Sequence, residues 1–213
     1  MARGLLRRLS GPGGGGRAWS CLATLLAAGA FADAFWPAHD ALAWRPAAWH
    51  QPWRWWSAAW VHFSDRHLAA NLAGTLVVGA LGLAARLPRR STLAWALAWP
   101  LTHLALLARP DLVLYGGLSG VLHAGVAAAV VPLLRRPGRD RAVGAAVLAG
   151  LLVKLALERP WGPATLRADG WDIALAPAAH AAGAAAGLLC AVLAEAARGA
   201  FSAPTPGGAH SPG

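Results

Sequence analysis

Charged residues are scarce in this sequence. Asp, Glu, Lys and Arg make up only 13% of its 213 residues, whereas 57% are hydrophobic, which is far from the composition of an average soluble domain. Among the charged residues the acidic ones are fewer, with 9 Asp and Glu against 19 Lys and Arg, so the net charge is +10. This composition argues against a soluble globular protein.

Cysteine is nearly absent as well. Cys21 and Cys190 lie far apart in apolar segments, and two such thiols make neither a disulfide framework nor a metal site. Several histidines also lack regular ligand spacing, namely His39, His50, His62 and His103. We therefore expect no metal and no cofactor.

Long apolar segments dominate the rest of the chain. Each is long enough to cross a bilayer core of about 30 Å as a helix. We place six spans near residues 18–36, 67–86, 91–108, 112–134, 142–158 and 172–196. The sequence thus predicts an all-α membrane protein with a six-helix domain over residues 18–198.

The basic residues gather at alternate ends of these spans. With the N-terminus inside, the cytoplasmic segments hold 12 of the 19 Lys and Arg residues, as the positive-inside rule requires. We therefore expect both termini to be cytoplasmic, with residues 1–17 as a basic tail and residues 199–213 as a disordered tail. Because the charges follow helix ends, a nucleic-acid partner is not expected.

The segment between the first two spans is rich in tryptophan. Seven of the twelve Trp residues occur between Trp36 and Trp60. Trp prefers the bilayer interface, which accommodates both its apolar ring and its N–H group. We expect this loop, residues 37–66, to lie in the outer membrane surface.

Four polar residues inside the apolar segments form a pattern. His67 and Asn71 share one face of the second span, Ser119 lies among glycines in the fourth, and His180 lies in the sixth. These three spans run in the same direction, so we expect the four side chains at one depth in the outer leaflet. Polar groups are costly in lipid and tend to be functional there.

The four residue types suit nucleophilic catalysis. A neutral imidazole within reach of a hydroxyl can take its proton, and the N–H groups of His67 and Asn71 can stabilise an oxyanion. Read alone, Gly117-x-Ser119-Gly120 is more typical of close helix packing. It also lacks the second glycine of the Gly-x-Ser-x-Gly elbow, which excludes the α/β-hydrolase fold.

The spacing of glycines in the sixth span suggests how the serine and histidine could meet. His180, Gly183 and Gly187 lie on one helix face, and Gly183-x-x-x-Gly187 permits close approach of a second helix. If this face meets the glycine-rich start of the fourth span, His180 comes within reach of Ser119.

Taken together, these residues resemble the rhomboid family of intramembrane serine proteases. The matching motifs are Trp53-Arg54, His67-x-x-x-Asn71, Gly117-x-Ser119-Gly120 and Ala179-His180-x-x-Gly183-x-x-x-Gly187. The resemblance covers about residues 50–190 and implies a six-helix core with a Ser–His dyad and no metal.

The resemblance also implies a role for each residue. Ser119 would be the nucleophile and His180 the general base, while the Ser119 N–H, His67 and Asn71 would form the oxyanion hole. Trp53-Arg54 would have a structural role in the surface loop.

His123 departs from the family pattern, since many rhomboids carry a Tyr four residues after the serine. The sequence GLSGVLHAG is similar to the signature of rhombosortases, a compact bacterial subgroup. That similarity implies membrane-anchored substrates with a Gly-Gly motif, a hydrophobic span and a basic tail, cut at the periplasmic face of the inner membrane. We expect His123 to pack on His180 as the Tyr does; a role as an alternative base, or in fixing the His180 tautomer, stays open.

Other functions stay open at this point. An ordinary rhomboid would cleave transmembrane helices with small, helix-breaking residues, and a rhomboid-like pseudoenzyme would bind membrane clients without cutting them. A transporter is disfavoured, because no inverted repeat and no paired acids occur within the spans. Lys154 and Glu158 are expected to pair with each other, and Asp33 to be reached by water.

Overall fold

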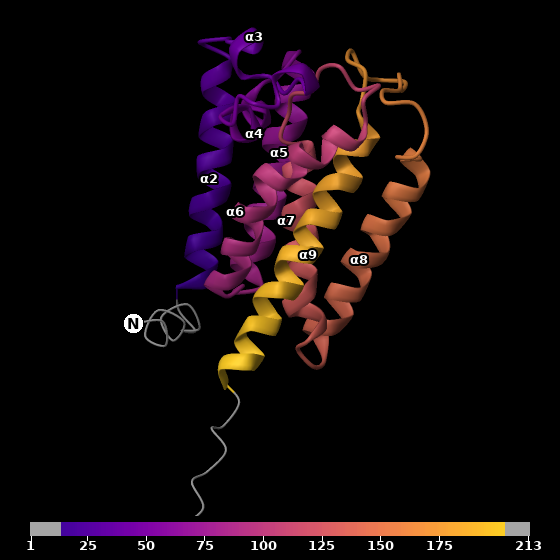
Figure 1. Ribbon diagram of the computed structural model, residues 1–213. Coiled ribbons are helices and arrows are strands. Elements are labelled where there is room, and N and C mark those ends of the chain that lie inside the picture. Colours follow the sequence, from indigo (N-terminus) through magenta and orange to yellow (C-terminus); the bar gives the residue numbers. More distant parts are fainter. Residues whose placement is uncertain (1–13, 203–213) are drawn as a thin grey trace, which may run out of the picture.

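The computed structural model describes residues 14–202 as a predominantly helical bundle (Figure 1), which confirms that part of the predicted fold class. The long helices are α2 (Gly15–Asp33), α5 (Asp65–Ala84), α6 (Arg89–Leu104), α7 (Ser119–Leu134), α8 (Arg139–Glu158) and α9 (Pro177–Ser202). Helix α6 continues as the 3-10 helix η3 (Ala105–Ala108). The loop between α2 and α5 holds the short helices α3 (His39–Leu42), η1 (Pro46–Ala48), α4 (Arg54–Ser57) and η2 (Ala58–Trp60).

The two predicted tails are shorter than expected where the structure describes them. Helix α2 begins at Gly15, within the predicted tail of residues 1–17, and α9 continues to Ser202, past the predicted end of the domain. The rest of both tails, residues 1–13 and 203–213, lies outside the described residues. The start of α2 and the end of α9 lie at the same end of the bundle (Figure 1).

The predicted fourth and sixth spans begin too early, and this changes where the candidate site residues lie. Residues 112–118 form a loop, because Gly117 has a positive φ of 127° and Tyr115 pairs with Trp44 in an isolated antiparallel bridge. Helix α9 begins at Pro177, a residue suited to the first helical position. Ser119 is therefore the first residue of α7 rather than a mid-helix residue, and His180 is the fourth of α9.

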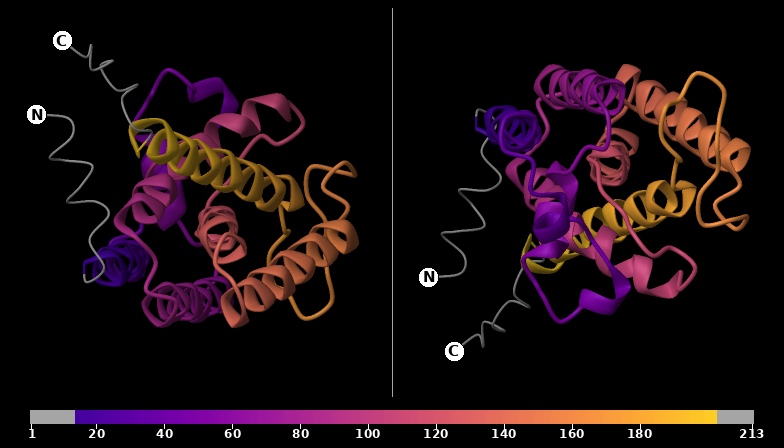
Figure 2. Two further views of the ribbon diagram at one scale, coloured as in Figure 1. Left: turned by 90° about the horizontal axis from the view of Figure 1, so that it is seen from below. Right: turned by 90° about the horizontal axis from the view of Figure 1, so that it is seen from above.

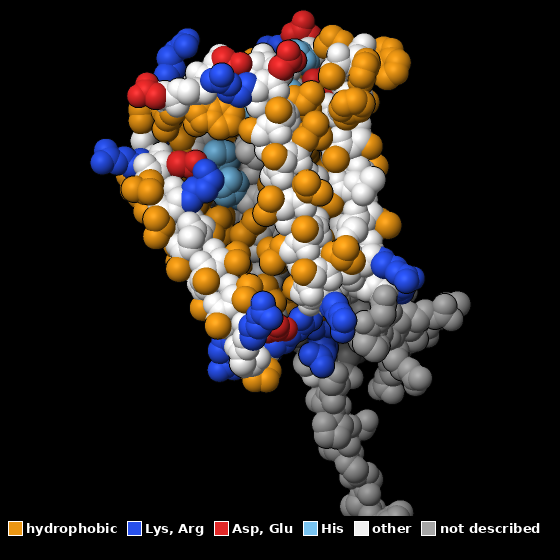
Figure 3. Space-filling view, turned by 180° about the vertical axis from the view of Figure 1, so that it is seen from behind, with side chains coloured by type: hydrophobic (Ala, Val, Ile, Leu, Met, Phe, Trp, Pro, Cys, Tyr) orange, Lys and Arg blue, Asp and Glu red, His pale blue; other side chains and the backbone are white. Residues whose placement is uncertain are grey.

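The surface is that of a membrane protein. Within residues 14–202, three helical segments could cross a bilayer by length and composition, namely Asp65–Ala84, Arg89–Ala108 and Pro177–Gly199, and the apolar helix Ser119–Leu134 is shorter. Figure 3 shows hydrophobic side chains covering the middle of one face, with charged side chains gathered toward the two ends.

Helix α7 lies in the middle of the bundle, enclosed by the other long helices (Figure 2). Most of its residues are buried, from Gly120 to Leu133. Its contact with α9 is close: a Cβ on Gly183 would lie 1.9 Å from the Gly120 carbonyl oxygen, and one on Gly187 would lie 2.1 Å from that of Ala124. The glycine face of α9 thus meets the start of α7, and backbone packs on backbone.

The tryptophan-rich loop is fixed by a buried arginine. Arg54 donates hydrogen bonds to the Ala43 carbonyl oxygen at 2.6 Å and to Gln51 Oε1 at 2.6 Å. The Trp53 indole donates to the Ala41 carbonyl oxygen at 3.1 Å, while half of that residue stays exposed. These contacts agree with the structural role expected for Trp53-Arg54, and the exposed Trp rings suit a membrane surface.

Candidate active site

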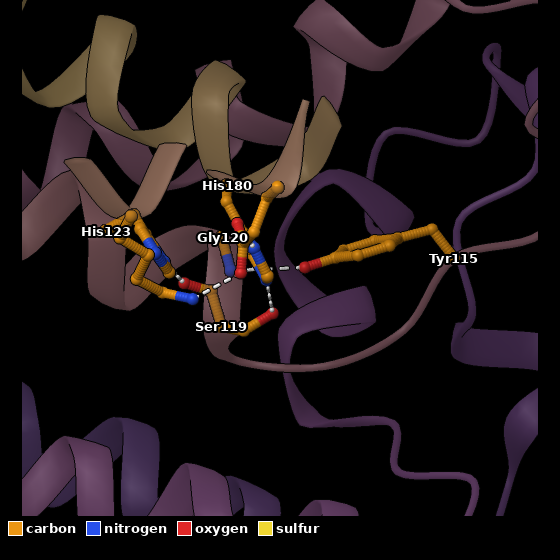
Figure 4. Close-up of polar contacts among 7 residues, drawn as sticks. Tyr115, Ser119, Gly120, His123 and His180 are labelled. Carbon is orange, nitrogen blue, oxygen red and sulfur yellow. Dashed lines mark hydrogen bonds and ion pairs between the residues drawn. The ribbon is translucent and has the colours of Figure 1, made fainter. Parts of the chain in front are cut away.

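Ser119 lies where the loop of residues 112–118 enters α7. The Gly120 N–H donates to the Tyr115 hydroxyl oxygen at 3.2 Å (Figure 4), and that hydroxyl donates to the Gly117 carbonyl oxygen at 3.1 Å. The Gly117 N–H donates to the Ala58 carbonyl oxygen at 2.9 Å. The first N–H groups of a helix have no helical acceptor and carry a partial positive charge, so the Ser119 N–H suits a developing anion.

His180 approaches Ser119 from α9. Its Nε2 lies 2.9 Å from the Ser119 hydroxyl oxygen, within hydrogen-bond distance (Figure 4). The histidine is 6% exposed, so water competes little for this contact. The two residues come from helices that meet through glycines, which explains how a small hydroxyl and an imidazole can touch across a helix interface.

The other ring nitrogen of His180 contacts an acid that the sequence analysis had paired only with a lysine. His180 Nδ1 lies 2.7 Å from Glu158 Oε2, at the last residue of α8. The predicted Lys154–Glu158 pair is confirmed, through the second carboxylate oxygen. One carboxylate thus bridges a lysine on its own helix and the histidine of another.

His123 packs on His180 as expected. The two rings are stacked, with centroids 4.3 Å apart and planes 10° apart. His123 Nδ1 lies 2.6 Å from the Ser119 carbonyl oxygen, so this nitrogen carries the proton and donates it. Because His180 Nδ1 faces Glu158, it is Glu158 rather than His123 that contacts the tautomer-setting nitrogen.

Helix α5 carries His67 and Asn71, which lie beside Ser119. A Cβ on Gly117 would lie 2.6 Å from His67 Nε2 and 3.4 Å from Asn71 Nδ2, so both nitrogens line the same side of the serine loop. His67 Nδ1 is buried without a hydrogen-bond partner among the described residues. Nε2 is therefore the ring nitrogen of His67 that faces the space next to Ser119 and can form a hydrogen bond there.

Asn71 is oriented by His62, which spacing alone had left without a role. His62 Nδ1 lies 2.9 Å from the Trp60 carbonyl oxygen, so it carries the proton, and Nε2 accepts from Asn71 Nδ2 at 3.0 Å. Burial lowers the pKa of His62, which keeps this ring neutral. The second N–H of the Asn71 amide is left for the cavity.

Asp33 supports this arrangement from α2. Its Oδ2 accepts from the His62 backbone N–H at 3.0 Å and lies 3.2 Å from His39 Nε2. The expectation that water reaches Asp33 is wrong: the residue is only 7% exposed, because the loop folds over the end of α2.

Removing the His62 side-chain contacts should weaken a reaction that needs Asn71 as a donor. In His62→Phe, the Trp60 carbonyl and the Asn71 amide each lose a partner, and we expect about a tenfold to hundredfold loss of Ser119-dependent turnover. His62→Gln can donate to one and accept from the other, so it should restore most of the activity. The two variants are compared by initial rate at matched amounts of folded protein; equal rates would contradict a role for His62.

A cavity of about 550 Å³ connects these residues. Its walls include His67, Asn71, Ser119, Glu158 and His180, and it extends along α5 and α8 past Val77 and Gly150. Val77 is 68% exposed, so the cavity opens sideways between α5 and α8. Figure 3 shows this hollow on the face of the molecule, with His side chains in it and an acidic and a basic side chain at its rim.

The chain matches a known protein family over most of its length. A family model described as Rhomboid domain matches residues 49–196. The chain belongs to the rhomboid family. A search of the curated proteins finds no match to this chain. Rhomboids are intramembrane serine proteases, although some members of the family are inactive, so membership supports proteolysis within the membrane in general.

The matched rhomboid domain contains all the site residues that the sequence analysis named. It brings Ser119 and His180 into contact, places His67 and Asn71 beside them, and stacks His123 on His180. Gly120, Gly183 and Gly187 form the helix contact, and Gly117 lies against the His67 ring. Trp53 and Arg54 lie in the loop and do not line the cavity.

One group of side chains in this rhomboid has the composition of a metal site. Donor atoms of His123, Glu158 and His180 lie within 4.8 Å of one another. The lone pair of an imidazole nitrogen lies in the plane of the ring, and the two rings are stacked, so their lone pairs do not converge on one point. The arrangement suits proton transfer better than metal binding.

The structure adds two residues to the site, Glu158 and His62, and only the first could have been found from the sequence with one further step. Glu158 lies at the outer end of the fifth span, on the side from which the sixth span brings in His180, and an acid at that end of an apolar segment is a candidate partner for an intramembrane histidine. His62 gave no such signal, because its contact with Asn71 depends on how the loop returns to α5.

Proposed function

We propose that this rhomboid is an intramembrane serine endopeptidase with Ser119 as nucleophile and His180 as general base. The observation that carries the proposal is the 2.9 Å contact between Ser119 Oγ and His180 Nε2 at the wall of a laterally open cavity. A hydroxyl becomes an effective nucleophile only when a base at this distance can take its proton.

The geometry supports the two steps of acyl transfer. Ser119 Oγ attacks the scissile carbonyl carbon while its proton passes to His180 Nε2. The tetrahedral intermediate then loses the amine, which leaves with that proton, and an ester forms on Ser119. A water molecule attacks the ester and gives a proton to His180 Nε2. The second tetrahedral intermediate then releases the carboxylic acid as that proton passes from Nε2 to Ser119 Oγ, which restores both residues.

We propose three donors for the oxyanion. The Ser119 N–H lies at the start of α7, where the helix favours negative charge. His67 Nε2 and the free N–H of Asn71 face the same side of the serine loop. Removal of one such donor in other enzymes costs about 10²–10³-fold in rate.

The lateral opening suits a substrate that arrives from the bilayer. Lipid-facing residues such as Val77 on α5 and Gly150 on α8 line its outer part, while the polar groups lie deeper. A peptide that leaves a helix here would expose its carbonyl groups to donors instead of to lipid, where unpaired backbone groups are unfavourable.

We further propose that the six long helices α2, α5, α6, α7, α8 and α9 each cross a bacterial inner membrane, with both termini in the cytoplasm. The described ends of α2 and α9 lie at one end of the bundle (Figure 1), and the other long helices begin or end there beside a group of arginines, which supports that assignment. The group includes Arg86, Arg89, Arg90, Arg135, Arg136, Arg139 and Arg141. The site would then face the periplasm.

For substrates, we propose membrane-anchored exported proteins that carry a Gly-Gly motif, a hydrophobic span and a basic tail. The similarity to rhombosortases supports this choice, and His123 stacked on His180 occupies the position that distinguishes that subgroup. An ordinary rhomboid specificity for other transmembrane helices is the alternative within the family.

The test is a cleavage assay with matched substrates. The protein is co-expressed with an exported reporter that ends in Gly-Gly, a hydrophobic span and a basic tail, and with the same reporter carrying Val-Val. C-terminal shortening of the first reporter, measured by mass spectrometry and dependent on Ser119 and His180, is the expected result. Equal cleavage of both reporters would overturn the Gly-Gly specificity, and cleavage of neither, together with no labelling of Ser119 by a fluorophosphonate, would indicate a client-binding protein.

A further inference from the structure

The carboxylate of Glu158 is the one acidic group at the wall of the cavity among the described residues. We propose that Glu158 is a positioning residue for His180, so that the reaction uses a Ser–His–Glu array rather than a dyad. This inference rests on the proposed roles of Ser119 and His180.

The hydrogen bonds of His180 specify its tautomer. A carboxylate can only accept, so the 2.7 Å contact with Glu158 Oε2 requires the proton on Nδ1. Nε2 is then unprotonated and faces Ser119 Oγ at 2.9 Å, as a base must. Without an acceptor at Nδ1, the opposite tautomer could form, and its Nε2–H could not take the serine proton.

Glu158 is itself held in place from two directions. It is the last residue of α8, and its other oxygen pairs with Lys154 one turn earlier on the same helix. The Glu158 side chain is 18% exposed, against 49% for Lys154. An ion pair with a purely surface role would turn both oxygens outward, whereas here one oxygen points to a buried imidazole.

The charge of Glu158 also matches the course of the reaction. When His180 takes the serine proton it becomes an imidazolium, and a carboxylate in contact with Nδ1 stabilises that cation. Lys154 offsets part of the negative charge, which favours a carboxylate that orients the ring without taking its proton. No proton moves to Glu158 in any step.

The decisive comparison is among substitutions of Glu158. Glu158→Gln keeps the size of the side chain but lets an N–H group face Nδ1, so we expect kcat to fall by about 10²–10⁴-fold with KM within about threefold of wild type. Glu158→Asp keeps the acceptor on a shorter stem and should stay within about tenfold of wild type. Asp140→Asn, an acid-to-amide change at the other end of α8 in a partly exposed pair with Arg136, is the matched control.

A pH profile separates positioning from a loss of structure. The titratable or charged groups around His180 are Glu158 and Lys154 on α8, His123 on α7 and His67 on α5. With the carboxylate removed, an imidazolium at this position would lose its charged partner, so the acid limb of the rate profile should move to lower pH in Glu158→Gln and not in Asp140→Asn. A merely structural role would lower the amplitude and leave the limb in place.

Failure of the positioning role can be distinguished from failure of the proposed proteolytic function. If Glu158→Gln turns over at the wild-type rate with an unchanged acid limb, the positioning role is wrong while the proteolytic function stands. If Glu158→Gln does not fold, the rate and the acid limb of the pH profile are measured for Glu158→Asp instead. An Asp variant that folds but has no activity would also overturn the proposal. If the wild type shows no Ser119-dependent turnover, it is the proposed function that fails.

Discussion

Replacing Ser119 by alanine should abolish both substrate cleavage and covalent labelling by a fluorophosphonate. The hydroxyl is the group that would form the bond, and His180 is placed to activate it. A loss of at least about 10³-fold is expected, since the loss of a nucleophile removes the covalent route rather than weakening it. The change deletes one oxygen atom at the start of α7, so the fold should persist.

The measurement is in-gel fluorescence after labelling of membranes, with the amount of folded protein matched by thermal melting. Ser20→Ala serves as control, because Ser20 is a hydroxyl on α2 that bonds only its own helix, at the Gly16 carbonyl oxygen. His180→Ala should lose labelling as Ser119→Ala does. Undiminished labelling of Ser119→Ala would disprove the mechanism.

Replacing Gly183 by alanine should separate α7 from α9 and inactivate the protein. The new Cβ would lie 1.9 Å from the Gly120 carbonyl oxygen, and this neighbour is backbone, which cannot turn aside as a side chain can. Overpacking of this kind costs about 1–3 kcal/mol or more. Because His180 and Ser119 lie on the two helices that must move apart, a shift of about 1 Å should lower the rate about 10²-fold even in protein that folds.

The matched control is Gly199→Ala, the same substitution on the same helix. A Cβ there would meet nothing within 4 Å, and Ala favours helix over Gly. Thermal melting and the rate of fluorophosphonate labelling are measured for both variants. If Gly183→Ala labels as fast as Gly199→Ala and melts at the same temperature, then the close contact of α7 and α9 is not what holds the two residues together.

Sequence reasoning located the residues of the site better than the helices that carry them. Ser119, His180, His67 and Asn71 follow from polar residues in apolar segments, because burial in lipid leaves few reasons to retain such groups. The start of α7 did not follow, since residues 112–118 are as apolar as the helix itself. Residues 112–118 stay outside the helix because Tyr115 pairs with Trp44, a contact across 71 residues of sequence.

The glycine spacing in α9 shows what a local sequence pattern can predict about a contact between helices. Gly183 and Gly187 predicted a close helix contact, and the structure supplies its partner, the backbone of Gly120 and Ala124 on α7. The i, i+4 spacing of Lys154 and Glu158 likewise predicted their pair, since those neighbours lie on one helix. The second contact of Glu158, with His180, joins two helices and no local spacing contains it.

Composition and periodicity are local properties, and they are enough to indicate a helical membrane protein with a serine, two histidines and an asparagine that the bilayer would otherwise exclude. Three features could be seen only in the folded chain: Glu158 faces Nδ1 of His180, His62 holds Asn71, and the cavity opens between α5 and α8. These depend on the angles at which separate helices and the tryptophan-rich loop meet, and packing of the whole bundle sets those angles.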